Sequence, residues 1–168
     1  MYISLKIQRR KQNNMNNKQI KQHRMNWKII TEHDNISLHD HSISDIHFGA
    51  DIILLFDDGI DVTRDNIKNE TGRHKRTGSA SVILHNGIYM RGIKFLPNDA
   101  EKSVNKEELS NIDLEVLEFL FDSDSRKIEI IGNAWDECLL CKLEFKASKV
   151  SYCWNEFVDD AWFQDWDK

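Results

Sequence analysis

The chain has 168 residues, of which 40% are hydrophobic and 10% aromatic. That length suits one domain, and that apolar content is too high for a chain that stays unfolded. The longest unbroken apolar run is Ile52 to Phe56, whereas a membrane-spanning helix needs about 20 residues. The sequence therefore predicts neither a membrane segment nor a secretory signal.

The net charge of −5 hides a strong asymmetry. Residues 1–28 hold eight of the 23 basic residues and no acid, which leaves 15 basic against 28 acidic residues after position 28, a net of −13. An acidic body repels nucleic acids and membrane surfaces and favours basic partners. We therefore expect a basic protein partner, no membrane contact, and no nucleic acid, whose binding is mostly electrostatic.

Residues 1–26 form a basic leader rich in Asn, Gln and Lys. Such a composition buries too little surface to offset the entropy lost on ordering. We expect this leader to be disordered or loosely attached, and residues 27–168 to form a single β-rich domain.

From residue 27 the apolar side chains recur at every second position, the period of a half-buried strand. The segment 36–48 alternates in this way, and Gly49-Ala50-Asp51 separates it from the apolar run Ile52 to Phe56. Asp57-Asp58-Gly59 then predicts a hairpin into a strand at Ile60 to Thr63, because Gly accepts the positive φ of a tight turn.

Residues 64–78 are polar and predict a loop. Strands are expected at Ser81 to Leu84 and Ile88 to Phe95, joined by His85-Asn86-Gly87 as an Asn-Gly hairpin turn. A short helix is expected at Lys106 to Leu109.

The segment from Leu114 to Phe121 admits two interpretations. Its apolar residues, with Leu109 and Ile112, share a helical face, but a turn at Asp122 to Ser125 and a matching strand at Lys127 to Ile131 favour a β-hairpin. Strands at Leu139 to Phe145 and Val150 to Trp154 follow, and a short helix at Glu156 to Trp166. The spacing predicts a mainly β fold, an antiparallel sandwich or partly open barrel of eight or nine strands with one or two short helices.

His39 and His41 are the candidate metal ligands. Residues two apart on a strand share a face, so both imidazoles would reach one ion. The alternative is that both lie on the solvent-facing side of a half-exposed strand, and we favour that interpretation, with no cofactor.

The three cysteines are Cys138, Cys141 and Cys153, an odd and small number typical of a reducing compartment such as the cytoplasm. Cys138 and Cys141 have C-x-x-C spacing, but two leucines separate them in a strand-like run. Extended backbone points such thiols to opposite faces, so we interpret them as structural.

The loop Thr71 to Ser79 is basic and bounded by glycines. It lacks the G-x-x-x-x-G-K-[ST] pattern and the following helix of a phosphate-binding loop. Arg73, Lys75 and Arg76 stay candidates for contact with an anion or a partner.

The C-terminal segment combines aromatic and acidic residues. Trp is enriched at protein interfaces, and acids speed the encounter with a basic partner. The candidate partner-binding residues are Glu156, Asp159, Asp160, Trp162 and Trp166. The alternative is that these aromatics close the end of the β core.

Three segments carry a resemblance: H-D-H-S-I-x-D-I (His39 to Ile46), D-I-I-L-L-F-D-D-G (Asp51 to Gly59) and Y-C-W-N-E-F (Tyr152 to Phe157). Together they resemble small, uncharacterised bacterial β-rich proteins, and the acidic type is similar to immunity proteins, which neutralise a toxin by blocking its surface. The resemblance implies an inhibitor of a basic partner and transfers no active-site residue.

No nucleophile elbow or other catalytic signature is present. The leading hypothesis is thus a non-enzymatic, acidic, protein-binding domain of the immunity-like kind. The second is a metal-dependent enzyme or small-ligand-binding β-barrel that uses His39 and His41.

Overall fold

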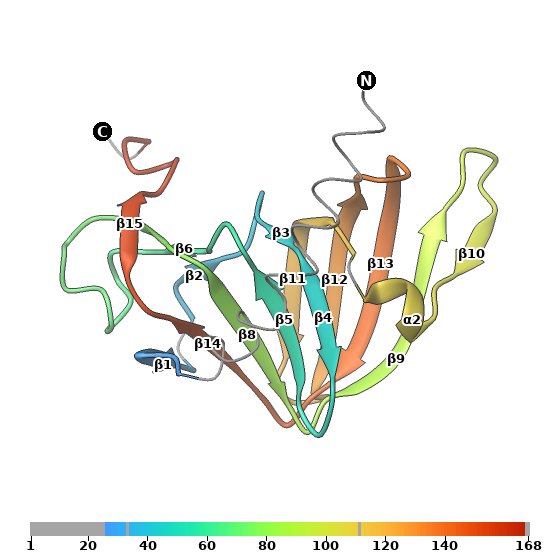
Figure 1. The fold of residues 1–168 in the computed structure, drawn as a ribbon, viewed down its shortest axis with the longest axis horizontal. Coiled ribbons are helices and arrows are strands. Elements are labelled where there is room, and N and C mark those ends of the chain that lie inside the picture. Colours follow the sequence, from blue (N-terminus) through green and yellow to red (C-terminus); the bar gives the residue numbers. More distant parts are fainter. Residues whose placement is uncertain (1–25, 33, 111, 167–168) are drawn as a thin grey trace.

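A computed structural model describes residues 26–32, 34–110 and 112–166, and the predicted leader lies outside them except for its last residue. The described chain is mainly β, with one short helix and three antiparallel sheets, which confirms the predicted fold class (Figure 1). In this part of the chain no helix has the length and apolar character to cross a bilayer.

The first sheet has five strands in the order β1-β14-β8-β5-β4. They are β1 (Ile29–Thr31), β14 (Lys149–Trp154), β8 (Ala80–His85), β5 (Ile52–Phe56) and β4 (Asp45–Phe48). Four of the five residues of β5 are buried, which explains its unbroken apolar sequence.

The second sheet has six strands in the order β10-β9-β13-β12-β11-β3. They are β10 (Glu101–Ser103), β9 (Ile88–Phe95), β13 (Leu139–Lys146), β12 (Lys127–Ala134), β11 (Leu114–Asp122) and β3 (Ser42–Ile43). Asp122 pairs with Lys127, so the predicted β11–β12 hairpin is confirmed. In β12 every second residue from Ile128 to Ala134 is buried, as the sequence alternation predicts.

The outer face of the six-stranded sheet carries a ladder of charges. Glu129 and Glu144 stand directly opposite each other on β12 and β13. Lys142 bridges them, with its Nζ 3.1 Å from Glu129 Oε2 and 3.3 Å from Glu144 Oε1. Arg91 on β9 also pairs with Glu144, its Nε 2.8 Å from Oε2. Glu129 and Glu144 therefore already have cationic partners.

The two large sheets face each other across the hydrophobic core, and their strands meet at the lower end in Figure 1. Ser44 carries the chain from β3 in one sheet to β4 in the other, and its amide donates to Leu55 O (2.8 Å). The core includes the fully buried Trp154, Phe56 and Phe145. The helix α2 (Lys106–Leu109) lies where the sequence predicts it and buries Leu109.

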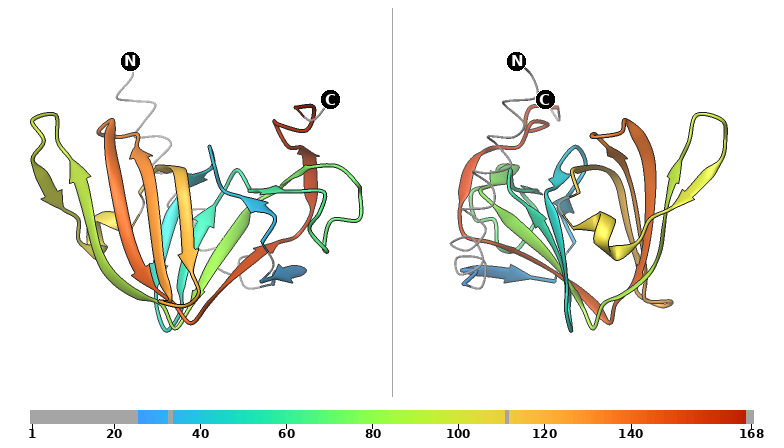
Figure 2. Two further views of the ribbon diagram at one scale, coloured as in Figure 1. Left: turned by 180° about the vertical axis from the view of Figure 1, so that it is seen from behind. Right: turned by 45° about the vertical axis from the view of Figure 1, so that its right-hand side comes forward.

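The third sheet has the order β15-β7-β6-β2, with β15 (Phe157–Asp160), β7 (Lys75–Thr77), β6 (Asp61–Val62) and β2 (Ile36–Ser37). Three of its strands continue strands of the five-stranded sheet: β14 leads into β15, β7 into β8 and β5 into β6. Segments 57–60, 78–79 and 155–156 therefore form a crease between the two sheets (Figure 2).

The predicted Asp57-Asp58-Gly59 hairpin is wrong. β5 pairs with β4 and β8, whereas β6 pairs with β2 and β7. Gly59 has φ +84° and approaches the neighbouring strand so closely that a Cβ there would lie 2.2 Å from Thr77 O. The positive φ expected of a turn glycine is present, but it bends a continuing strand instead of reversing it.

Three smaller expectations also fail. β8 and β9 belong to different sheets, so the turn at His85-Asn86-Gly87 links sheets and closes no hairpin. The expected loop 64–78 contains the whole of β7, and the expected helix at Glu156 to Trp166 consists of β15 followed by turns. In both segments, pairing between β7 and β15 decides the backbone, and no local pattern shows that pairing.

Candidate functional site

The two polar candidate regions from the sequence lie side by side. β15 is an edge strand that pairs with β7, and this register places Asp159 beside Arg76 and Asp160 beside Lys75. Glu156 precedes β15 and is exposed, while Trp162 and Trp166 follow it. The basic loop and the acidic C-terminal segment therefore lie next to each other, joined by the pairing of β7 with β15.

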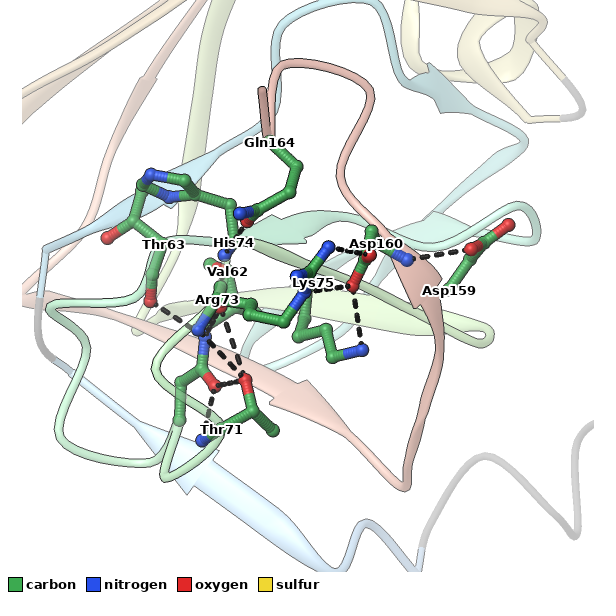
Figure 3. A network of polar contacts seen from close by, with 10 residues as sticks. Val62, Thr63, Thr71, Arg73, His74, Lys75, Asp159, Asp160 and Gln164 are labelled. Atoms are coloured by element: carbon green, nitrogen blue, oxygen red, sulfur yellow. Dashed lines mark hydrogen bonds and ion pairs between the residues drawn. The ribbon is translucent and has the colours of Figure 1, made fainter. Parts of the chain in front are cut away.

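Asp160 is the centre of an ion-pair cluster (Figure 3). Arg73 binds it through two nitrogens, with Nη2 2.5 Å from Oδ2 and Nε 3.2 Å from Oδ1. Lys75 Nζ lies 2.8 Å from Oδ1. The hydrogen bonds from Arg73 and then Lys75 lower the pKa of Asp160 to about 2, although desolvation opposes them. This carboxylate anchors the C-terminal segment to the loop.

Asn69 organises the loop that presents Arg73. Its side-chain amide donates to the carbonyl oxygens of Val62, Thr63 and Arg73 at 3.2, 3.0 and 2.7 Å. Its Oδ1 accepts from the Thr71 hydroxyl at 2.7 Å (Figure 3). Asn69 is buried, so a polar loop has an ordered polar centre. The sequence gives one weak signal of this role, an Asn within a turn-forming stretch.

The end of the chain is held against the same loop. The amide of His74 donates to Gln164 Oε1 (2.5 Å), and the rings of His74 and Phe163 lie 5.0 Å apart. The carbonyl of His74 accepts from the amide of Ala161 (2.9 Å). These contacts fix the segment 161–166, which therefore presents its remaining side chains in defined positions.

Trp162 and Trp166 lie outside this anchored layer. Their rings pack edge to face with centroids 4.5 Å apart. They are 43% and 72% exposed, and Val158 on β15 is 60% exposed. We call Glu156, Val158, Asp159, Trp162 and Trp166 the C-terminal surface. The alternative that the C-terminal aromatics close the β core fits Trp154, which is fully buried, and does not fit the exposed Trp162 and Trp166.

Arg76 faces a different acid. Its Nε lies 3.6 Å from Asp61 Oδ1, and His41 Nε2 lies 3.0 Å from Asp61 Oδ2. Asp61 is 0% exposed and His41 3%. Neither contact has the geometry of a hydrogen bond. Sequence reasoning missed Asp61, because a lone Asp in an alternating strand reads as a solvent-facing residue.

His39 and His41 do not share a face. Asp40 between them has φ +63°, and this left-handed residue breaks the strand geometry on which the shared-ligand hypothesis depends. The imidazole of His39 is 52% exposed and its Nδ1 lies 2.8 Å from Leu117 O. His41 is buried, so the solvent-facing alternative is wrong for it. Within the described residues, no group of three or more His, Cys, Asp or Glu side chains is arranged to hold a metal ion.

The three cysteines are unpaired. Cys138 is exposed in the turn that precedes β13, where its φ is +54°, whereas Cys141 is buried within β13, so the two thiols do not alternate along one strand as expected. Burial raises the pKa of Cys141 and of Cys153 to about 11. Both buried thiols are therefore small core side chains and not nucleophiles.

Comparison of the chain with protein-family models, curated proteins and solved structures finds no match. The candidate site therefore has to be interpreted from its own geometry.

Proposed function

We propose that the chain is a non-enzymatic, acidic, protein-binding domain that covers a basic surface of another protein, in the manner of an immunity protein. The proposal rests above all on the exposed Trp162–Trp166 pair held on a rigid base. Exposed aromatic residues that are fixed in position bind with little loss of conformational entropy, and Trp dominates many interfaces.

The charge around this pair favours a basic partner. Four carboxylates (Glu156, Asp159, Asp160 and Asp165) lie on the C-terminal segment against two cations (Arg73 and Lys75), which leaves two negative charges. The remainder of the chain after residue 28 is also acidic. Complementary charge raises the rate of encounter and selects the partner.

The basic loop supports a protein partner better than a nucleic acid. Arg73 and Lys75 are paired with Asp160, and Arg76 faces Asp61. Binding a phosphate through these residues would first require breaking these ion pairs, and an acidic surface surrounds them. We therefore assign the three cations a role in building the surface.

Side chains, not the backbone of β15, make the proposed contact. The β15–β7 register shifts between Phe157 and Asp159. The amide of Asp160 donates to Asp159 Oδ1 at 2.8 Å. A bulge makes an edge strand a poor template for another strand, and the hydrogen bond from the Asp160 amide to the Asp159 carboxylate uses a donor that another strand would need. The edge is thus blunted, and the aromatic pair projects beside it.

The proposal places this activity in the cytoplasm. The three cysteines form no disulfide, and two of them are buried where oxidation would disrupt packing. Such thiols persist in a reducing compartment.

The test is capture of a partner on the full-length chain, followed by purification of that partner and calorimetric titration. We expect a basic protein that binds at a saturable 1:1 ratio. Trp162→Ala with Trp166→Ala should weaken binding by about 30-fold or more, the effect of losing one strong interface residue. Trp135→Ala is the matched control, because Trp135 is also 50% exposed but follows β12 in the six-stranded sheet.

Charge reversal gives an independent measurement. Glu156→Lys with Asp159→Lys should slow association and reduce its dependence on salt. A partner that binds the double Trp variant as tightly as the parent would refute the proposed surface, and a partner without a basic surface would refute the electrostatic argument.

A further inference from the structure

A cavity of about 370 Å³ opens beside β11, away from the residues of the C-terminal surface. β3 covers only Leu114 and Glu115 on this edge of β11, so the stretch from Leu117 to Phe121 borders the cavity instead of a neighbouring strand. Ile36 and Tyr152 line it from β2 and β14. The volume lies within the range of small-molecule sites, ~300–1,000 Å³.

The wall of this cavity is mixed, with aromatic and aliphatic side chains beside the polar Ser37, His39 and Glu118. Phe119 and Phe121 project from the same side of β11, and both are half-buried against the core. Ile36, Leu38 and the ring of Tyr152 complete the apolar lining. Exposed aromatic surface in a concave site favours a ligand with an apolar body.

The charge in the cavity is negative. Asp34 and Glu118 contribute to the lining, and none of the described residues that line it is a Lys or Arg. Desolvation raises the pKa of Tyr152 to about 12, and the negative charge of Asp34 adds to this rise; both residues line the cavity. A carboxylate beside aromatic faces is the combination that binds organic cations, through Coulomb attraction and cation–π contact.

His39 stands at the same opening and has one nitrogen already engaged. Its Nδ1 lies 2.8 Å from Leu117 O, a carbonyl that only accepts, so Nδ1 carries the proton. Its Nε2 lies 3.3 Å from Asp40 Oδ1. The carboxylates of Asp34 and Glu118 are acceptors that this lining offers to a cationic ligand.

We propose that this cavity binds a small organic cation with an aromatic or branched apolar body, its ammonium group at Asp34 and its body against Phe119 and Phe121. The proposal is independent of the C-terminal surface. His39 lines this cavity and His41 does not, so the proposal uses neither residue as a metal ligand.

The test is calorimetric titration of the full-length chain with three matched probes: phenethylamine, 2-phenylethanol and 3-phenylpropionate. These probes share a ring and differ in charge. We expect phenethylamine to bind at a 1:1 ratio and at least tenfold more tightly than the other two. The Asp34→Asn variant should lose about tenfold, the worth of one charge-assisted contact, and should remove most of the salt dependence.

Asp113→Asn is the control, since Asp113 is exposed just before β11 and does not line the cavity. Phe121→Leu keeps the site apolar and should weaken phenethylamine more than 2-phenylethanol, because only the cation loses a cation–π contact. The proposal is overturned by equal binding of the three probes, by equal losses in the two Asp variants, or by no saturable binding at millimolar concentration. Binding of a lysine-containing peptide without binding of phenethylamine would also overturn it and assign the cavity to a protein partner.

Discussion

The buried carboxylate of Asp61 provides the sharpest test of how this fold is held together. Asp61→Asn keeps the shape of the side chain and removes its charge. His41 and Arg76 then lose the anion that faces them at 3.0 and 3.6 Å. Removing one partner from a buried ion pair costs about 3–5 kcal/mol. Because Arg76 is 38% exposed and water relieves part of its loss, we expect the lower end of that range.

The measurement is urea denaturation followed by far-ultraviolet circular dichroism, with thermal unfolding as a second readout. A loss of about 3 kcal/mol corresponds to a fall in Tm of roughly 6–12 °C for a chain of this size. Asp159→Asn is the control. Asp159 lies opposite the same Arg76 in the register between β15 and β7, but it is exposed. We expect its replacement to change the free energy of unfolding by less than ~0.5 kcal/mol.

A double-mutant cycle separates charge from packing. If Asp61 and Arg76 interact, Asp61→Asn should cost less in the Arg76→Gln background than in the parent. We expect the charge of Asp61, facing His41 and Arg76, to stabilise the third sheet. A loss of unfolding free energy below about 1 kcal/mol for Asp61→Asn, or equal losses for Asp61→Asn and Asp159→Asn, would refute this expectation.

Three further results follow from the structure. Gly59→Ala should lower the free energy of unfolding by more than ~2 kcal/mol in urea denaturation, because the new Cβ would lie 2.2 Å from a backbone oxygen. Gly72→Ala, also at positive φ but in open space, should lower it by only about 1 kcal/mol in the same assay. Ellman's reagent should label Cys138 alone in the folded chain and all three cysteines in denaturant; two fast-reacting thiols in the native state would contradict the burial of the others. An NMR titration should give Asp160 a pKa of about 2, and Arg73→Gln should raise that pKa toward 3.8. Because the pKa of Asp160 is lower in the folded chain than in the unfolded chain, this carboxylate stabilises the fold above pH 3.8, and the stabilisation is lost as the pH falls toward 2.

The strands that alternate over eight residues could be predicted from the sequence, and β12 shows why. Its buried positions are set by the period of the strand itself, and the turn at 122–125 fixes its register with β11. The strand interpretation of β11 was right for the same reason. In this hairpin each strand pairs with its neighbour in the sequence, so the alternation of the sequence suffices to predict the structure.

Prediction failed where a residue's partner lies far along the chain. A glycine with positive φ occurs both in hairpin turns and in bends of a continuing strand, so Gly59 alone does not distinguish these two structures. Trp162 and Trp166 are spaced as on a helix, but the backbone before them pairs with β7. The ion pair between Arg73 and Asp160 joins residues 87 positions apart. Composition identified both residues as candidates but not that they neutralise each other.

The crease also contains a tryptophan whose intrinsic fluorescence can report on its geometry. Trp154 is the last residue of β14 and is fully buried, and its ring lies 6.0 Å from that of Phe157, the first residue of β15. The two rings therefore stand on opposite sides of the fold line. A partner bound at β15 that changes the angle between the sheets would therefore alter the surroundings of this indole. In a chain that keeps Trp154 as its sole tryptophan, emission wavelength would report bending at the crease without an added dye.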